Sequence, residues 1–69
     1  MWLELNDELY NLDRITYIAK KNHNISEDSI EYVIYLDNLY IRYDNENERN
    51  NDYINIKMKL KTNKKYLKL

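Results

Sequence analysis

Apolar and polar residues alternate along the first part of the chain with the two-residue period of β-strands. Residues 1–5 and 8–12 alternate in this way on either side of an Asn-Asp dipeptide at positions 6–7, which is typical of a tight turn. A corner at residues 12–14 separates them from residues 15–21, whose β-branched and aromatic side chains favour a third strand. The N-terminal third therefore predicts three short antiparallel strands.

The strongest local pattern follows a polar segment at residues 22–28, which we expect to be a loop. In "SIEYVIYLDNLYIRYD", two alternating runs flank Asp37-Asn38, and both of these residue types tolerate the positive φ of a type I′ turn. A two-residue loop fixes the register of the hairpin. The facing pairs are then Leu36 with Leu39, Tyr35 with Tyr40, Ile34 with Ile41, Val33 with Arg42, and Tyr32 with Tyr43.

This register divides the side chains of the hairpin between two faces, because successive residues of a strand point to opposite sides. The predicted core face carries Tyr32, Ile34, Leu36, Leu39, Ile41 and Tyr43. The opposite face is mixed, and we expect a partner to bind there. It carries Val33, Tyr35, Tyr40 and Arg42, flanked by Glu31 and Asp44.

The C-terminal segment fits two periods, one of a strand and one of a helix. Ile54, Ile56, Met58 and Leu60 alternate with polar residues, whereas Tyr53, Ile56 and Leu60 follow helical spacing. A helix over residues 46–62 is predicted, because Asn45 and Glu48 form a capping-box-like pair and acids precede lysines along the helix dipole. Lys57, Lys61 and Lys65 would then form a solvent stripe, and residues 62–69 would fray. A strand stays the alternative.

The predicted fold class is α+β, in a single domain over residues 1–69. A curled antiparallel meander of four to five short strands would carry one C-terminal helix across its open side. If the last segment is a strand, the fold is nearly all-β.

Size and composition add constraints on assembly. So short a chain buries only about 60% of its unfolded surface. It has no cysteine for disulfides or zinc sites, so we expect a homo-oligomer. Without a recognisable signal peptide or membrane span, a cytoplasmic location is expected, in the host cell if the chain is phage-encoded.

The sequence offers little for catalysis. The only histidine, His23, lies in the predicted loop, where we expect it to be solvated, because a general base needs an oriented partner. Asp44, Glu46 and Glu48 alternate as cation ligands could, but helix capping explains them, and there is no glycine for a calcium loop. We expect no enzyme activity, no metal and no cofactor.

Charge and aromatic content point to binding instead. Residues 1–52 hold all 12 acids and five bases, a net charge of −7, whereas residues 53–69 hold six lysines and no acid. The lysine tail makes nucleic-acid binding an alternative, although such proteins usually carry a basic footprint over the whole domain. The eight tyrosines include Tyr35 and Tyr40, which lie beside Arg42. Tyr and Arg are typical of interface hot spots.

The abundance of Asn, Lys, Ile and Tyr, with no Gly or Pro, indicates AT-rich coding DNA. The segments "YNLDRITYI" and "YVIYLDNLYIRYDNENERNND" resemble small uncharacterised single-domain proteins of low-GC bacteria and their phages. Some of those proteins inhibit host defence, as anti-CRISPR proteins do. The resemblance implies an inhibitor that blocks a larger host protein.

In that interpretation the partner-binding residues are Tyr35, Tyr40, Arg42, Asp44, Glu46 and Glu48, with the acids engaging a basic groove. Two alternatives stay open. One is an oligomeric sponge that sequesters a nucleotide or other small ligand, and the other is a small nucleic-acid-binding regulator.

Overall fold

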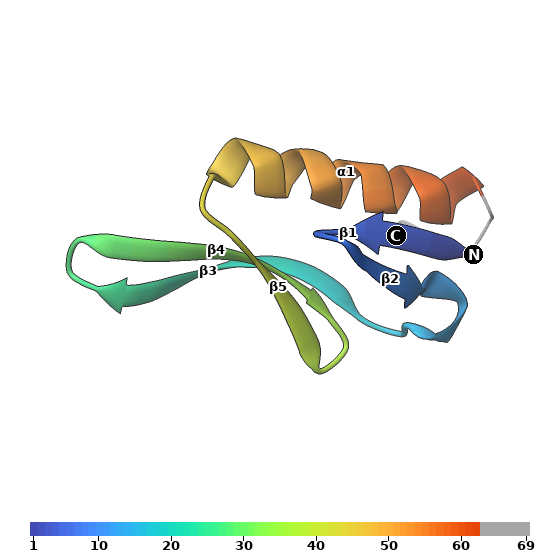
Figure 1. Ribbon diagram of the computed structural model, residues 1–69, viewed down its shortest axis with the longest axis horizontal. Coiled ribbons are helices and arrows are strands. Elements are labelled where there is room, and N and C mark those ends of the chain that lie inside the picture. Colours follow the sequence, from blue (N-terminus) through green and yellow to red (C-terminus); the bar gives the residue numbers. More distant parts are fainter. Residues whose placement is uncertain (63–69) are drawn as a thin grey trace.

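The computed structural model describes residues 1–62, which form antiparallel strands and one long C-terminal helix (Figure 1). This confirms the predicted α+β class. In chain order the elements are β1 (Trp2–Leu5), β2 (Glu8–Asn11), the 3-10 helix η1 (Leu12–Arg14), β3 (Ile18–Ser26), β4 (Ser29–Leu36), β5 (Leu39–Tyr43) and α1 (Glu46–Thr62).

The described strands form two sheets rather than one continuous meander. β1 pairs with β2, and β3, β4 and β5 form a three-stranded sheet in that order. The third strand begins at Ile18, later than predicted, because the backbone N–H groups of Thr16 and Tyr17 both donate to the Asp37 carboxylate, at 3.0 and 2.9 Å. These bonds attach the segment before β3 to the β4–β5 turn and separate the two sheets.

The loop predicted at residues 22–28 is wrong. β3 runs to Ser26, and only the two residues Glu27 and Asp28 form the turn into β4. Asn22, His23 and Asn24 pair across the ladder with residues 32, 31 and 30 of β4. Backbone pairing with β4 overrides the low strand propensity of these polar side chains, because propensity in sheets depends on the neighbouring strand.

The β4–β5 register is confirmed at all five predicted pairs. The turn itself differs from the prediction, because only Asp37 of the dipeptide has a positive φ, at 56°. Positive φ at both turn residues occurs instead in the β1–β2 turn, at Asn6 and Asp7. Leu39 was predicted to lie in the core, but it is 63% exposed. It is the first residue of the edge strand β5, directly after the turn.

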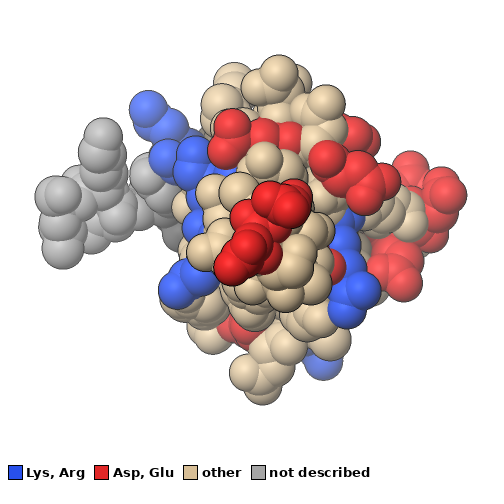
Figure 2. All heavy atoms as spheres, turned by 90° about the vertical axis from the view of Figure 1, so that its left-hand side faces the viewer, with Lys and Arg blue, Asp and Glu red and all other residues tan. Residues whose placement is uncertain are grey.

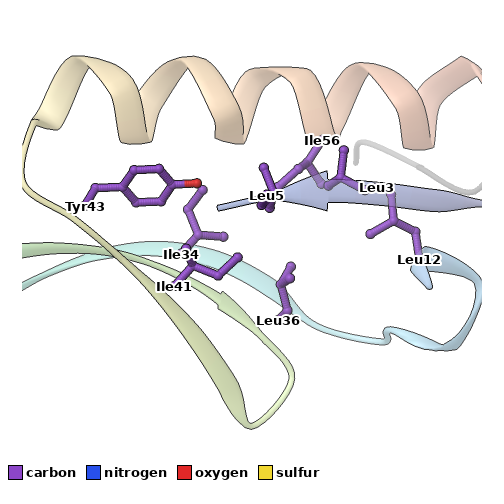
Figure 3. Close-up of a cluster of buried hydrophobic side chains, with 8 residues drawn as sticks. All are labelled: Leu3, Leu5, Leu12, Ile34, Leu36, Ile41, Tyr43 and Ile56. Carbon is purple, nitrogen blue, oxygen red and sulfur yellow. The ribbon is translucent and has the colours of Figure 1, made fainter. Parts of the chain in front are cut away.

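Helix α1 has the predicted bounds. The side-chain amide oxygen of Asn45 accepts from the N–H of Glu48 at 3.2 Å, which caps the first turn. Ile56 is completely buried, and Tyr53 and Leu60 pack against the core as predicted. The core cluster joins both sheets to α1 (Figure 3) and consists of Leu3, Leu5, Leu12, Ile34, Leu36, Ile41, Tyr43 and Ile56.

The predicted lysine stripe is only partly described. Lys57 is half-buried, and its ammonium lies 5.6 Å from the ring centroid of Tyr53, as does that of Lys20. Lys61 is exposed. Lys65 and the predicted frayed end at residues 63–69 lie outside the described residues.

Candidate functional site

One face of the three-stranded sheet lies under α1, and the other is not covered by any element of residues 1–62 (Figure 1). Because Ile34, Ile41 and Tyr43 belong to the core under α1, strand alternation directs the intervening side chains to the uncovered side. We call this the open face. It carries His23, Glu31, Val33, Tyr35, Tyr40 and Arg42.

Three rings form the centre of the open face. Tyr35 and Tyr40 are directly opposite each other on β4 and β5, with ring centroids 5.6 Å apart and planes tilted by 48°. The His23 ring lies 5.6 Å from Tyr35 and 6.2 Å from Tyr40. A hydrogen bond of 2.8 Å joins the Tyr35 hydroxyl to Nε2 of His23. These spacings are typical of favourable aromatic pairs.

Charged side chains complete this arrangement into a ring of contacts. The Arg42 guanidinium donates to the Tyr40 hydroxyl at 2.8 Å, and its Nε lies 3.4 Å from the Glu31 carboxylate. Nδ1 of His23 lies 3.8 Å from the other oxygen of Glu31. The hydrogen bond to Tyr40, followed by the charge of Glu31, raises the pKa of Arg42. Val33 lies on β4 between Glu31 and Tyr35. It is fully buried, although no helix or strand of residues 1–62 covers this face.

His23 is therefore not the solvated loop residue predicted from the sequence. It lies on β3, and each of its ring nitrogens faces a protein group, so the imidazole connects Tyr35 to Glu31. The sequence has no alternation of apolar and polar residues that could have indicated this, because residues 20–24 are all polar.

The open face continues into a shallow cavity of about 310 Å³, lined by Tyr17, Lys21, Tyr35, Asp37 and Asn38. Tyr17 is 49% exposed. A third tyrosine and a cation thus extend the aromatic surface beyond the central ring.

The three predicted acidic residues lie elsewhere, where β5 passes into α1. The Glu46 carboxylate is 3.8 Å from the Arg49 guanidinium, and Glu48 belongs to the capped first turn. Figure 2 shows acidic side chains gathered at the end of the molecule that holds the β3–β4 turn and the start of α1. We call this the acidic end: Glu27, Asp28, Asp44, Glu46 and Glu48. Among residues 1–62, no group of three or more side chains could hold a metal ion.

Arg49 is a residue whose role the sequence did not reveal. Only 4% of it is exposed, and its guanidinium donates to the Lys21 carbonyl at 2.7 Å and to the Asn22 side chain at 2.9 Å. It also lies 5.5 Å from the Tyr32 ring. Its spacing from Tyr53 and Ile56 places it on the buried stripe of α1. Arg49 thereby joins the start of α1 to β3.

Comparisons with known proteins find no significant match to a family model, a curated protein or a solved structure. No helix within the described part of the chain is long and apolar enough to cross a membrane.

Proposed function

We propose that this chain is a non-enzymatic binding protein that blocks a larger protein through its open face. The observation that carries this proposal is the fixed cluster of Tyr35, Tyr40, His23 and Arg42 on an uncovered sheet. Tyrosine and arginine supply much of the energy of protein interfaces. Because these side chains already contact one another, little rotamer entropy remains to be lost when a partner binds.

The acidic end supports a basic partner surface. Five carboxylates at the β3–β4 turn and the start of α1 lie on a body that carries a net charge of −7 over residues 1–52. A groove that normally holds nucleic acid is basic, and complementary charge increases the rate of association with such a surface. The narrower proposal is that the chain is a phage or mobile-element inhibitor and that the protein it blocks belongs to a bacterial defence system. The small size and an amino-acid composition typical of AT-rich coding DNA support it.

A nucleotide is the competing ligand, and one feature favours it. In the shallow cavity of the open face, Lys21 lies beside Tyr17 and Tyr35, so a base could stack there and a phosphate could contact the ammonium. Asp37 lines the same cavity and would repel a phosphate. Protein binding is therefore the better supported of the two.

The test is a quantitative pull-down from the source organism with three forms of the protein. These are wild type, Tyr35→Ala/Tyr40→Ala, and a control, Leu9→Ala/Ile54→Ala. The control removes side chains that are 66% and 52% exposed and lie away from the open face. We expect wild type and control to retain the same protein and the open-face variant to lose it.

Retention by all three forms would reject the open face as the binding surface. The absorbance ratio of the purified wild type gives a second readout. A co-purified nucleotide that is lost in the open-face variant would favour the competing ligand over a protein.

A further inference from the structure

Within residues 1–62, one edge of strand β1 has no strand paired to it. Among the described residues it pairs only with β2, and hydrogen-bonded and non-hydrogen-bonded pairs alternate along an antiparallel ladder. The Leu12 N–H donates to the Met1 carbonyl at 2.8 Å, so the pairs of Leu3 and Leu5 with β2 are of the hydrogen-bonded kind. The N–H and C=O groups of Trp2 and Glu4 therefore point away from β2.

This edge of β1 borders a groove of about 530 Å³ between β1 and α1. All four residues of β1 line it, together with Asp52, Asn55, Met58 and Lys59 of α1. Figure 1 shows β1 running alongside the helix. Trp2 and Met58 are 64% and 60% exposed, so both walls of the groove present apolar surface to solvent. The volume lies within the range of known ligand sites, about 300–1,000 Å³.

The groups on the groove define what it can bind. Four backbone groups at the spacing of alternate strand residues are matched by an extended peptide that adds as a further strand. Trp2 and Glu4 share one side of β1, so the peptide residues opposite them are two apart. Cross-strand pairing favours an apolar side chain opposite Trp2 and a basic one opposite Glu4. Glu4 and Asp52 contribute two carboxylates to the lining of the groove, and Lys59 contributes one ammonium.

We propose that this groove binds an extended segment of a partner protein by antiparallel strand addition to β1. The segment carries a basic residue opposite Glu4 and, two residues later, an apolar residue opposite Trp2. The groove lies between β1 and α1, so this site is separate from the open face and does not depend on the proposed function.

The probe is a fluorescein-labelled, capped hexapeptide, Thr-Val-Lys-Val-Leu-Thr, whose affinity for the full chain is measured by fluorescence anisotropy. NMR amide shifts of the ¹⁵N-labelled chain should concentrate at residues 2–5 and 52–59. A second peptide is N-methylated at its lysine and leucine, which removes the two N–H donors that face Trp2 and Glu4. It should bind about tenfold more weakly or worse, since each lost hydrogen bond costs about 1 kcal/mol.

A charge exchange tests the predicted register. Glu4→Lys should lower the affinity for the lysine peptide by about two- to fivefold, as expected for one cross-strand pair. It should raise the affinity for a peptide with glutamate in place of lysine by a similar factor. Glu27→Lys, at the β3–β4 turn, makes the same change in net charge and should leave both affinities unchanged.

Three results would overturn the proposal. The first is an absence of amide shifts at residues 2–5, and the second is equal binding of the N-methylated peptide. The third is a concentration-dependent shift of the same amides without peptide, because a second copy of the chain would then occupy the edge.

Discussion

The two faces of the β3–β4–β5 sheet are both ordered, but by different interactions. Under α1, Ile34 and Leu36 are buried by packing against other apolar side chains. On the open face, Tyr35, Tyr40 and Arg42 are positioned by ring contacts, hydrogen bonds and an ion pair. The core face accounts for folding, whereas the open face has a defined shape that the core does not require. This difference is why we propose the open face as the binding surface.

The core face should be the more sensitive of the two to a buried charge. Ile34 is completely buried, so Ile34→Asp places an unpaired carboxylate in the core and should leave the domain unfolded. Tyr40→Ala, on the open face of the adjacent strand, should retain the native circular dichroism spectrum. A folded Ile34→Asp variant would mean that the register is shifted by one residue, because such a slip exchanges the two faces.

The second prediction concerns the contribution of the buried Arg49 side chain to the stability of the fold. Arg49→Ala leaves the Lys21 carbonyl and the Asn22 side chain without their donor, and we expect a loss of about 3 kcal/mol in the free energy of unfolding. Urea denaturation measures this. Arg14→Ala removes an exposed arginine and serves as the control, with an expected change of about 0.5 kcal/mol or less. Equal midpoints for the two variants would refute the role of Arg49.

Asp37 controls where the sheet begins. Its carboxylate accepts from the N–H and hydroxyl of Thr16 and from the N–H of Tyr17, and its φ is 56°. Asp37→Ala should destabilise the fold by about 1–2 kcal/mol, because it removes these bonds and disfavours the positive φ. Asp37→Asn keeps a side-chain oxygen acceptor and tolerates positive φ, so it should cost less. Thermal melts of both variants compare them, and the reverse order would contradict the assignment.

The smallest effect concerns alkaline pH. Burial, and then the hydrogen bond to Asp52, raises the pKa of Tyr43 above its usual 10.0. Burial, followed by the hydrogen bond to Glu8, raises the pKa of Tyr10 to about 12. A raised folded-state pKa gives stability that is complete below pH 10 and is lost as pH rises through the folded value.

Urea midpoints measured from pH 8 to pH 12 should therefore fall for wild type and fall less for Tyr43→Phe. Tyr17→Phe, at an exposed tyrosine, is the control and should follow wild type. If Tyr43→Phe instead loses stability as steeply as wild type does, Tyr43 is not a source of the alkaline sensitivity.

Local signals in the sequence were sufficient for two elements. The Asp37-Asn38 dipeptide predicted the β4–β5 register, and Asn45 with the charge gradient predicted the bounds of α1. Both depend on residues close together along the chain. The division of the open face from the core face followed from the same register, so Tyr35, Tyr40 and Arg42 were brought together correctly.

Other features depend on residues far apart in sequence. The extension of β3 through His23 requires β4 as its partner, and the burial of Arg49 requires acceptors 27 and 28 residues away. Neither leaves a local pattern. For the same reason the sequence did not show that Glu46 and Glu48 belong to a different surface from Tyr35 and Tyr40. The two acids lie on α1, on the other side of the sheet from the two tyrosines.

The central claim is that the open face binds a larger protein. The most direct measurement is the dissociation constant of the captured partner for wild type and for Tyr35→Ala/Tyr40→Ala, by titration calorimetry, with both proteins shown to be folded. We predict a loss of at least about 2 kcal/mol, or roughly 30-fold, as at interface hot spots. An unchanged dissociation constant for a folded double variant would contradict the account and leave the two tyrosines with a structural role only.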